Sequence, residues 1–415
     1  MRNTRFMQAL DSVADFTPGR DADFFAALPA RPAVFVVEPA AALVGAKPYL
    51  LRTANLRERL LRLLGPPDPA SKRLNLRQFA GRVCYRVVGS AFELNLLHWQ
   101  HAKRLSPAHY REHLRIRPSA LLKVSLANAY PRCYATRRVG GSGFYFGPFA
   151  SRRAAETFAS GSLDLFKIRR CQIKIRRDPA FAGCIYSEMK MCLAPCFAGC
   201  SKQEYDAEVG RVVSFLASRG ASLSAELERE RERASEGLDF EGAAAVHRRV
   251  EKAADALRGL PELARRLEDL NAVVLQPSSR KKSVMVFAVL AGRIAEPREL
   301  CFEDMTGESR SVEQILREWL ESMARVDQPQ VAPPPASRQE CRELEDQLGL
   351  LARWFYGKPR VGEIFFRQGT ARNSLADVQD ATRARRNSEW PYRRILRGCS
   401  RILAPPSPVE EKEKQ

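Results

Sequence analysis

The sequence contains no run of apolar residues that approaches the roughly 20 needed to span a bilayer. Residues 1–20, MRNTRFMQALDSVADFTPGR, also lack the apolar core of a secretory signal. These two absences predict a cytoplasmic protein. Acidic residues are in deficit, because 48 Asp and Glu face 68 Lys and Arg, which leaves a formal net charge of +20. Such a charge favours polyanions, above all nucleic acid, over other partners; the alternative is a basic protein that is merely soluble or attracted to anionic membranes.

The hydrophobic patterns predict an α+β multidomain chain. Strand-like segments at Ala33–Glu38, Pro48–Arg52 and Arg82–Val88 alternate with helical ones, and Thr53 can cap the first of these helices. Later segments turn from cysteine-rich and basic to helical, and then to strand-like again. We therefore predict a small α/β sandwich at 28–110, a Cys-rich basic domain at 120–202, a helical region with a hairpin at 203–262, a partial C-terminal α/β region at 268–368 and a poorly ordered tail at 369–415.

Three segments of the first region share the register of a nuclease signature. They are PAVF at Pro32–Phe35, PYLLRTANLRERL at Pro48–Leu60, and FELNLLHWQHAKRLSP, in which Glu93 lies fourteen residues before Pro107. This pattern resembles the GIY-YIG nuclease domain as the UvrC family carries it. Tyr49, Asn55, Leu56, Arg59 and Glu93 match the family's positions.

The resemblance implies a role for each matching residue. Glu93 would hold a Mg²⁺ or Mn²⁺ ion, Arg59 would bind the phosphate, and Tyr49 would orient or deprotonate the attacking water. A tyrosine needs nearby cations to act as a base at neutral pH, and Arg52 and Arg59 could supply them while contacting DNA.

The chain departs from the family pattern at three positions. Phe35 replaces the first tyrosine, Leu51 replaces a glycine, and His98 replaces a second glutamate. The matching residues could therefore be ordinary core and surface residues of a domain that no longer cleaves. A further alternative is a metal site built from His98 and His101, one helical turn apart, with His109 or His113.

Cysteines crowd into one short segment. Cys171, Cys184, Cys192 and Cys196 have the spacing C-x12-C-x7-C-x3-C, and the last two lie in CLAPC. The segment resembles the cysteine region of UvrC, which implies a [4Fe-4S] cluster; zinc bound by the same four thiolates, or buried free cysteines, are the alternatives. Cys200 is a fifth thiol without an assigned role.

Basic residues surround these cysteines. They predict a phosphate-binding surface, with the alternation near Ile173 and Ile175 indicating a strand that displays its charges on one side; an ordinary solvated face is the alternative. The expected DNA-binding residues of this surface are Arg152, Arg153, Lys167, Arg169, Arg170, Lys174, Arg176 and Arg177.

The segment ASEGLDFEGAAAVHRRV, Ala234–Val250, resembles the UVR motif by which UvrC pairs with UvrB. The resemblance implies a helical hairpin that binds a UvrB-like protein. His247 and Arg248 stand where the family has an Arg-Asp pair, and a self-contained coiled coil is the alternative. The expected partner-binding residues are Leu238, Phe240, Ala243, Ala244 and Val250.

The resemblance is specific over residues 30–260 and looser to about 366, with no counterpart of the family's RNase H-like nuclease or helix-hairpin-helix pair. It implies a DNA-repair protein of nucleotide excision repair that, if active, makes the incision on the 3′ side of damage with one Mg²⁺ or Mn²⁺. The alternative is a catalytically inactive adaptor that binds DNA and UvrB. A cluster-based redox sensor is a third possibility.

Overall fold

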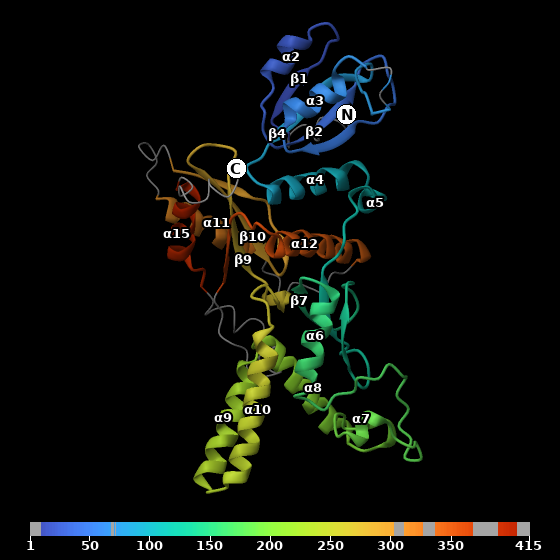
Figure 1. Cartoon of the computed structure of the whole chain (residues 1–415), viewed down its shortest axis with the longest axis vertical. Coiled ribbons are helices and arrows are strands. Elements are labelled where there is room, and N and C mark those ends of the chain that lie inside the picture. The colour runs from blue at the N-terminus through green and yellow to red at the C-terminus, as the bar shows by residue number, and fades with distance from the viewer. Residues whose placement is uncertain are drawn as a thin grey trace.

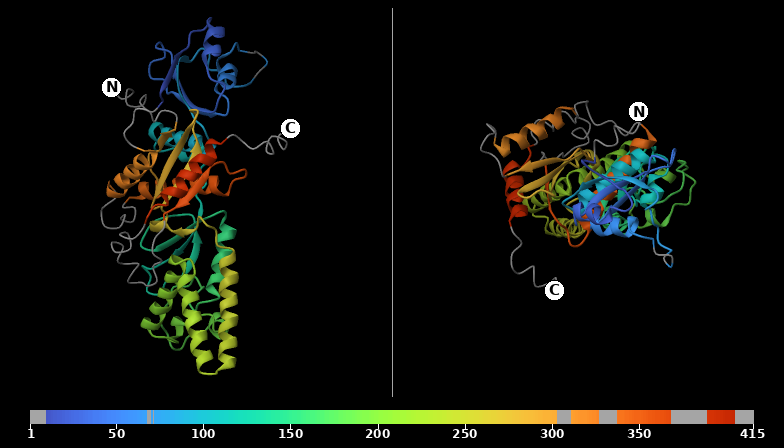
Figure 2. Two further views of the ribbon diagram at one scale, coloured as in Figure 1. Left: turned by 90° about the vertical axis from the view of Figure 1, so that its left-hand side faces the viewer. Right: turned by 90° about the horizontal axis from the view of Figure 1, so that it is seen from above.

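The computed structural model describes residues 10–67, 70, 72–302, 311–326, 337–367 and 389–404. The chain is elongated: a sheet domain lies at one end, a helical hairpin at the other, and two further sheets lie between them (Figures 1 and 2). No helix within these ranges is both long and apolar enough to cross a membrane. The mixture of helices with antiparallel sheets agrees with the predicted α+β class.

The first sheet is antiparallel, with its strands in the order β1-β4-β2-β3. Alternate residues of its central strand face opposite sides: Phe35 packs under α2 and α3, whereas Val34 packs against α4. The sheet therefore separates α3 from α4. Its elements are β1 (Ser12–Asp15), α2 (Asp21–Ala27), β2 (Ala33–Pro39), β3 (Tyr49–Thr53), α3 (Leu56–Leu64), β4 (Ala80–Val87) and α4 (Ala91–Leu105).

Helix α3 begins at a different cap from the one expected. The side chain of Asn55 accepts a hydrogen bond from the Glu58 N–H (3.2 Å) and is the N-cap. Thr53, the expected cap, instead accepts from the Asn55 N–H (3.1 Å) and so stabilises the turn before the helix. Both residue types can satisfy free N–H groups, and their order along the turn decides which one reaches the helix.

The first region also begins earlier than the expected boundary at residue 28. Strand β1 pairs with β4, and Phe16 and Phe25 lie in the same core as Phe35. A four-residue strand with only partial burial gives a weak periodic signal, which is why the sequence did not indicate it.

The second sheet has the order β6-β5-β7-β8, and α6 and α8 share its core. Strand β8 follows the helical hairpin in sequence and pairs with β7, so the hairpin is an insertion within this sheet's topology rather than a separate region. The elements are β5 (Ala120–Val124), β6 (Cys133–Thr136), β7 (Phe144–Phe149), α6 (Arg152–Leu163), α7 (Ile185–Glu188), the 3₁₀ turn Pro195–Phe197, α8 (Lys202–Ala217), α9 (Ala221–Glu236), α10 (Phe240–Arg258) and β8 (Arg265–Arg266).

The third sheet contains strands β11-β10-β9-β13, with β12 also paired to β10. Residues of β9 alternate between two cores: Val274 faces α12 and α4, and Val273 faces α11 and α15. The elements are α5 (Tyr110–Leu114), the 3₁₀ turn Leu267–Asp269, β9 (Ala272–Pro277), β10 (Ser283–Leu290), β11 (Arg293–Ile294), β12 (Arg298–Cys301), α11 (Val312–Val326), α12 (Arg338–Tyr356), β13 (Glu363–Phe366) and α15 (Tyr392–Leu403).

Helix α15 corrects the expectation of a poorly ordered tail over 369–415. Its Ile395 and Cys399 are fully buried beside β9 and β10. Four arginines in this short helix masked its apolar stripe, which is completed only when the sheet is present. The rest of the expected tail, 369–388 and 405–415, lies outside the described residues.

A buried carboxylate joins α12 to α4 and α5. Asp346 is 0% exposed and accepts hydrogen bonds from Trp99 Nε1–H (3.2 Å), the Tyr110 hydroxyl (2.7 Å) and Arg111 Nε–H (2.7 Å). The neighbouring Glu345 accepts from a terminal N–H of Arg111 (2.9 Å) and from the backbone N–H of Val139 (2.9 Å). Burial, assisted by Asp346, raises the pKa of Tyr110, which therefore remains a hydrogen-bond donor.

Replacing this carboxylate should weaken the joint. Asp346→Asn keeps the side-chain size but leaves the partly buried Arg111 without its main counter-ion, and we expect the free energy of unfolding to fall by about 3 kcal/mol. Urea denaturation followed by tryptophan fluorescence measures this. The matched control is Glu313→Gln, which removes an exposed ion pair with Arg317 (3.3 Å) and should change stability by less than about 0.5 kcal/mol. Equal stability of the two variants would contradict the role assigned to Asp346.

Candidate nucleic-acid interface

Most of the residues at the positions of the nuclease signature, matching or not, lie on the α3 side of the first sheet. Phe35 is fully buried under α3, and Leu51 is its direct cross-strand neighbour. Tyr49 is 40% exposed near the sheet edge, where its ring packs edge-on against Phe79 with centroids 5.0 Å apart. Arg59 is half-buried on α3. Tyr49 and Arg59 therefore lie on one side of the sheet.

Glu93 lies on the opposite side, in the first turn of α4. Glu93 is only 7% exposed, and its carboxylate accepts a hydrogen bond from the Gly89 N–H (3.1 Å). Burial raises the pKa of Glu93; the Gly89 N–H and Arg86 oppose this shift, whereas Glu299 adds to it. The structure does not bring Glu93 together with Tyr49 and Arg59, because α3 and α4 pack on different faces of the sheet.

Arg52 also faces α4 rather than Tyr49. It pairs in register with Val34, and its guanidinium donates to the side-chain oxygen of Asn95 on α4. Burial, together with nearby Arg353, lowers the pKa of Arg52. Successive strand residues point to alternate faces, and Arg52 comes three positions after Tyr49. Arg52 is therefore directed to the face opposite Tyr49.

The histidines of the alternative metal site do not converge. His101 is fully buried in α4, and burial lowers the pKa values of His98 and His101 to about 4. His109 and His113 are exposed on a following turn and helix, and the His109 imidazole lies 3.6 Å from Glu112. Within the described ranges, no three His, Cys, Asp or Glu side chains are placed to hold one metal ion.

The Cys-rich lobe, which we define as residues 164–200, consists mainly of loops. Its only regular elements are α7 and the 3₁₀ turn Pro195–Phe197. The strand expected near Ile173 and Ile175 is not formed, because these residues pair with no neighbouring strand. Backbone hydrogen bonds from Asp178 N–H to Cys196 O (2.8 Å) and from Leu193 N–H to Lys167 O (3.0 Å) hold the loops together.

The four spaced cysteines of this lobe lie in one neighbourhood and form no disulfide. Burial raises the pKa of the Cys192 thiol to about 11, and the other three thiols add to this effect. Among the described residues, no three of these thiols are placed to hold one metal ion. The residues concerned are Cys171, Cys184, Cys192 and Cys196; Cys200 is buried nearby beside Arg177.

The eight basic residues expected on one surface divide into two groups. The first group is occupied by protein partners. Arg169 is buried and donates to the carbonyls of Tyr130 (2.8 Å) and Ile173 (2.7 Å), so it supports the lobe rather than facing solvent. The others of this group are Arg152 with Glu156 (2.7 Å), Arg170 with Asp164 (2.8 Å) and Arg177 with the Cys200 carbonyl (3.2 Å).

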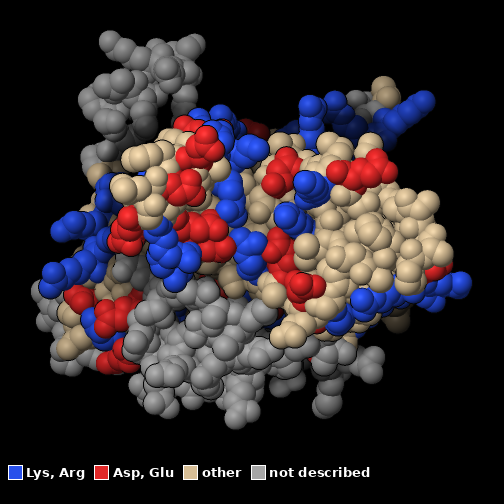
Figure 3. Space-filling view, turned by 90° about the horizontal axis from the view of Figure 1, so that it is seen from below, with Lys and Arg blue, Asp and Glu red and all other residues tan. Residues whose placement is uncertain are grey.

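The side chains of the second group are exposed and make no hydrogen bond or ion pair with the described residues. In the view from below, a largely uncharged surface lies at the right, with Lys and Arg along its lower edge and both acidic and basic side chains along its other margins (Figure 3). These cations can be reached by a phosphate backbone without first breaking an internal contact. They are Arg153, Lys167, Lys174 and Arg176.

Helices α9 and α10 pack side by side as a hairpin. The turn between the two helices lies at the far end of the molecule (Figure 1). Two large apolar residues at this turn are exposed, Leu238 (71%) and Phe240 (75%). Asp239 caps α10 by accepting from the Gly242 N–H (2.9 Å). The expected partner-binding residues are not all available: Ala244 is exposed and Ala243 half-buried, but Val250 packs toward the chain's own core.

Sequence reasoning missed two features. The Asp346 network joins residues about 235 positions apart, and the only local signal was a pair of acids beside the apolar positions Leu344 and Leu348. The second feature is a cleft between the Cys-rich lobe, α8 and α10. Its walls come from separate segments, and their side chains gave no shared motif.

Comparisons with known proteins point to one group. The model of the UvrC/Cho excinuclease middle domain matches residues 120–215. UvrABC system protein C of Dehalococcoides mccartyi is 25% identical over 323 residues, which cover 77% of this chain and 52% of that protein. The protein of the same name from Ruminiclostridium cellulolyticum is 30% identical over 191 residues, covering 46% of this chain and 31% of that protein.

A further relative, UvrABC system protein C of Rickettsia bellii, is 30% identical over 206 residues, covering 49% of this chain and 32% of that protein. No solved structure matches the chain. The chain thus spans about half the length, or less, of these curated relatives. The matched domain contains strands β5 to β7 of the second sheet, α6, the Cys-rich lobe and most of α8. The chain is therefore a UvrC-like protein.

Proposed function

We propose that this chain acts in nucleotide excision repair as an adaptor that binds DNA and a UvrB-like protein, without cleaving DNA through its first domain. The similarity to UvrABC system protein C supports the repair role. The placement of Glu93 and Arg59 on opposite sides of the first sheet supports the adaptor reading over the nuclease one.

Chemistry explains why that placement matters. Hydrolysis of a phosphodiester needs a metal ligand, a cation for the developing charge and a water-activating group around the same phosphate. Glu93 is engaged with the Gly89 N–H, and Phe35 has no hydroxyl to replace the missing tyrosine. Tyr49 and Arg59 alone can contact a phosphate but supply no metal site.

The adaptor is expected to bind DNA without cutting it. A gel shift should show a complex with duplex DNA that weakens as salt rises, because exposed cations such as Lys174 and Arg176 release counter-ions from the backbone. Incubation of the same duplex, damaged or with a flap, with Mn²⁺ should leave it intact. Nicking on the 3′ side of the lesion that Glu93→Ala abolishes would instead establish the nuclease with Glu93 as its metal ligand.

The Cys-rich lobe is proposed to hold a [4Fe-4S] cluster, which would fix its loops beside the exposed cations. The four free thiols in one neighbourhood support this assignment. Anaerobically purified protein should contain about four iron atoms per chain and show broad visible absorption. Cys192→Ser should lower the iron content, whereas Cys301→Ser, at an exposed cysteine of β12, should not. Zinc without iron in the wild type would overturn the cluster.

The hairpin tip is proposed to bind a UvrB-like partner, because Leu238 and Phe240 are large, apolar and exposed together. Immobilised UvrB should capture the wild type, and Phe240→Ala should lower the affinity at least about tenfold through loss of a buried aromatic anchor. Phe181→Ala is the matched control, since Phe181 is another exposed aromatic residue but lies in the Cys-rich lobe. Failure of UvrB to capture the wild type would refute the partner.

A further inference from the structure

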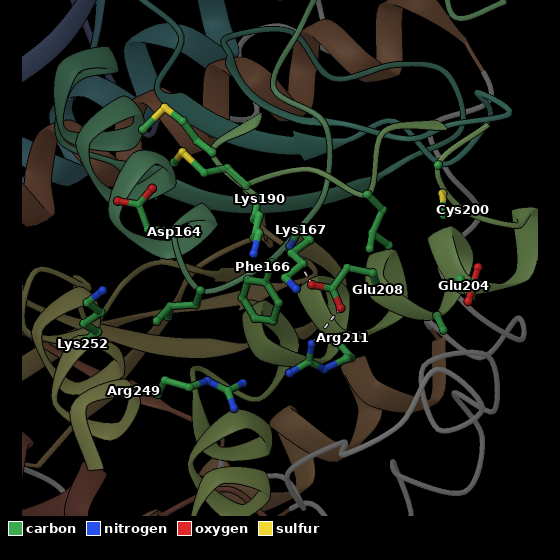
Figure 4. Close-up of a pocket in the computed structure, with 16 residues that line it drawn as sticks. Asp164, Phe166, Lys167, Lys190, Cys200, Glu204, Glu208, Arg211, Arg249 and Lys252 are labelled. Atoms are coloured by element: carbon green, nitrogen blue, oxygen red, sulfur yellow. Dashed lines mark hydrogen bonds and ion pairs between the residues drawn. The ribbon is translucent and has the colours of Figure 1, made fainter. Parts of the chain in front are cut away.

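A cleft of about 810 Å³ lies where the Cys-rich lobe meets the helices (Figure 4). The loop after α6 forms one wall, the segment after α7 a second, and α8 and α10 the others. None of the residues assigned to catalysis or to the hairpin tip lines it. The size falls in the range of about 300–1,000 Å³ that is usual for sites of small organic ligands.

The acidic side chains of the cleft already have partners. Asp164 pairs with Arg170 (2.8 Å), outside the cleft lining. Glu208 accepts from the backbone N–H of Lys167 (2.6 Å) and from Arg211 (2.7 Å). Glu204 accepts from the backbone N–H of Ser201 (2.7 Å), which completes the cap of α8. Asp164 and Glu208 are thus neutralised by arginines, whereas Glu204 keeps its charge; the lining as a whole still has five Lys and Arg against three Asp and Glu.

Three lysine amines of the cleft have no hydrogen-bond or ion-pair partner in the described part of the chain. Lys167 and Lys190 come from the Cys-rich lobe, before its first cysteine and after α7 respectively, and Lys252 comes from α10 (Figure 4). All three are exposed to solvent. Arg249, which also lines the cleft, is paired with Glu230 (2.7 Å). The uncompensated charge of the cleft is thus positive and distributed over separate walls.

The cleft also has an apolar side. Leu165, Met191 and Leu193 are half-buried there, and Met189 is exposed. The buried Phe166 ring also lines the cleft, and its centroid lies 5.6 Å from the Arg211 guanidinium carbon. Thioethers and alkyl groups can cover the flat face of a base, while ammonium groups bind a phosphate. An inorganic anion would leave this apolar surface uncovered.

We infer that the cleft binds one nucleotide, with its base against the methionine and leucine side chains and its phosphate at the lysines. The nucleotide could be part of an unstacked DNA strand or a free deoxynucleotide, because both offer the same groups. The first source rests on the proposed DNA binding, and the second does not. A bound nucleotide would contact both the Cys-rich lobe and α10, and so would hold the two together.

The test uses the full chain with two probes, dAMP and a 10-nucleotide single strand, and measures binding by equilibrium dialysis and fluorescence anisotropy. The double variant Lys190→Glu/Lys252→Glu should weaken binding of the recognised probe at least about tenfold. The slope of log K against log salt for the single strand should also fall in Lys190→Gln/Lys252→Gln, by about 0.7 for each phosphate contact that is lost. Lys72→Glu/Lys281→Glu is the matched control, with the same change of charge at exposed lysines outside the cleft.

The two probes separate the sources. Loss of single-strand binding with duplex binding retained assigns the cleft to a DNA strand, whereas loss of dAMP binding in a chain that binds no DNA would keep the cleft and refute the proposed function. Equal binding of both probes by the cleft variant and the control overturns the inference. Unchanged thermal unfolding of the variants shows that any loss is not a folding defect.

Discussion

The carboxylate of Asp346 is completely enclosed and accepts hydrogen bonds from Trp99, Tyr110 and Arg111. A charge that is removed from water is tolerated only when such partners replace the lost hydration. Because these donors belong to α4 and α5, the network fixes α4 along α12. Glu345 extends the same network to Val139, next to the second sheet. The relative position of all three sheets therefore depends on two adjacent acids in α12.

The same network influences where Glu93 lies relative to the first sheet. One side of α4 is held by α12, and Leu97 on its other side packs against Val34 of the first sheet. Glu93 begins this helix, so its position follows from packing between regions rather than from the nuclease-like pattern itself. Gly89 lies directly before α4, and a Cβ there would come within 2.2 Å of the Pro277 carbonyl oxygen, which shows how closely the third region approaches this turn.

The sequence allowed the local elements to be predicted, and the tertiary arrangement much less. The strands around Phe35 and Tyr49 and the hairpin that exposes Phe240 follow from periodicity and turn residues, which act over a few positions. Helix α15 and the cleft could not be predicted, because each depends on segments brought together from distant parts of the chain. The sequence predicted which basic residues lie near the cysteines. It did not indicate which of them are exposed to bind phosphate, and Arg169 is in fact buried. The register of Tyr49, Arg59 and Glu93 matched a nuclease pattern, although it contained no information on which face of the sheet each helix would cover.

The position of β8 has a mechanical consequence. The hairpin leaves the second sheet through α8 and returns to it at Arg265 and Arg266, which pair with Gly147 and Phe146 of β7. Near its base, Leu223, Leu227 and Ala253 are buried in the core of that sheet. Because the helices are packed at their base, a force applied at the hairpin tip would be transmitted through them to the β7–β8 strand pair. Any tilt of the tip has to be accommodated by the sheet beside the cysteines.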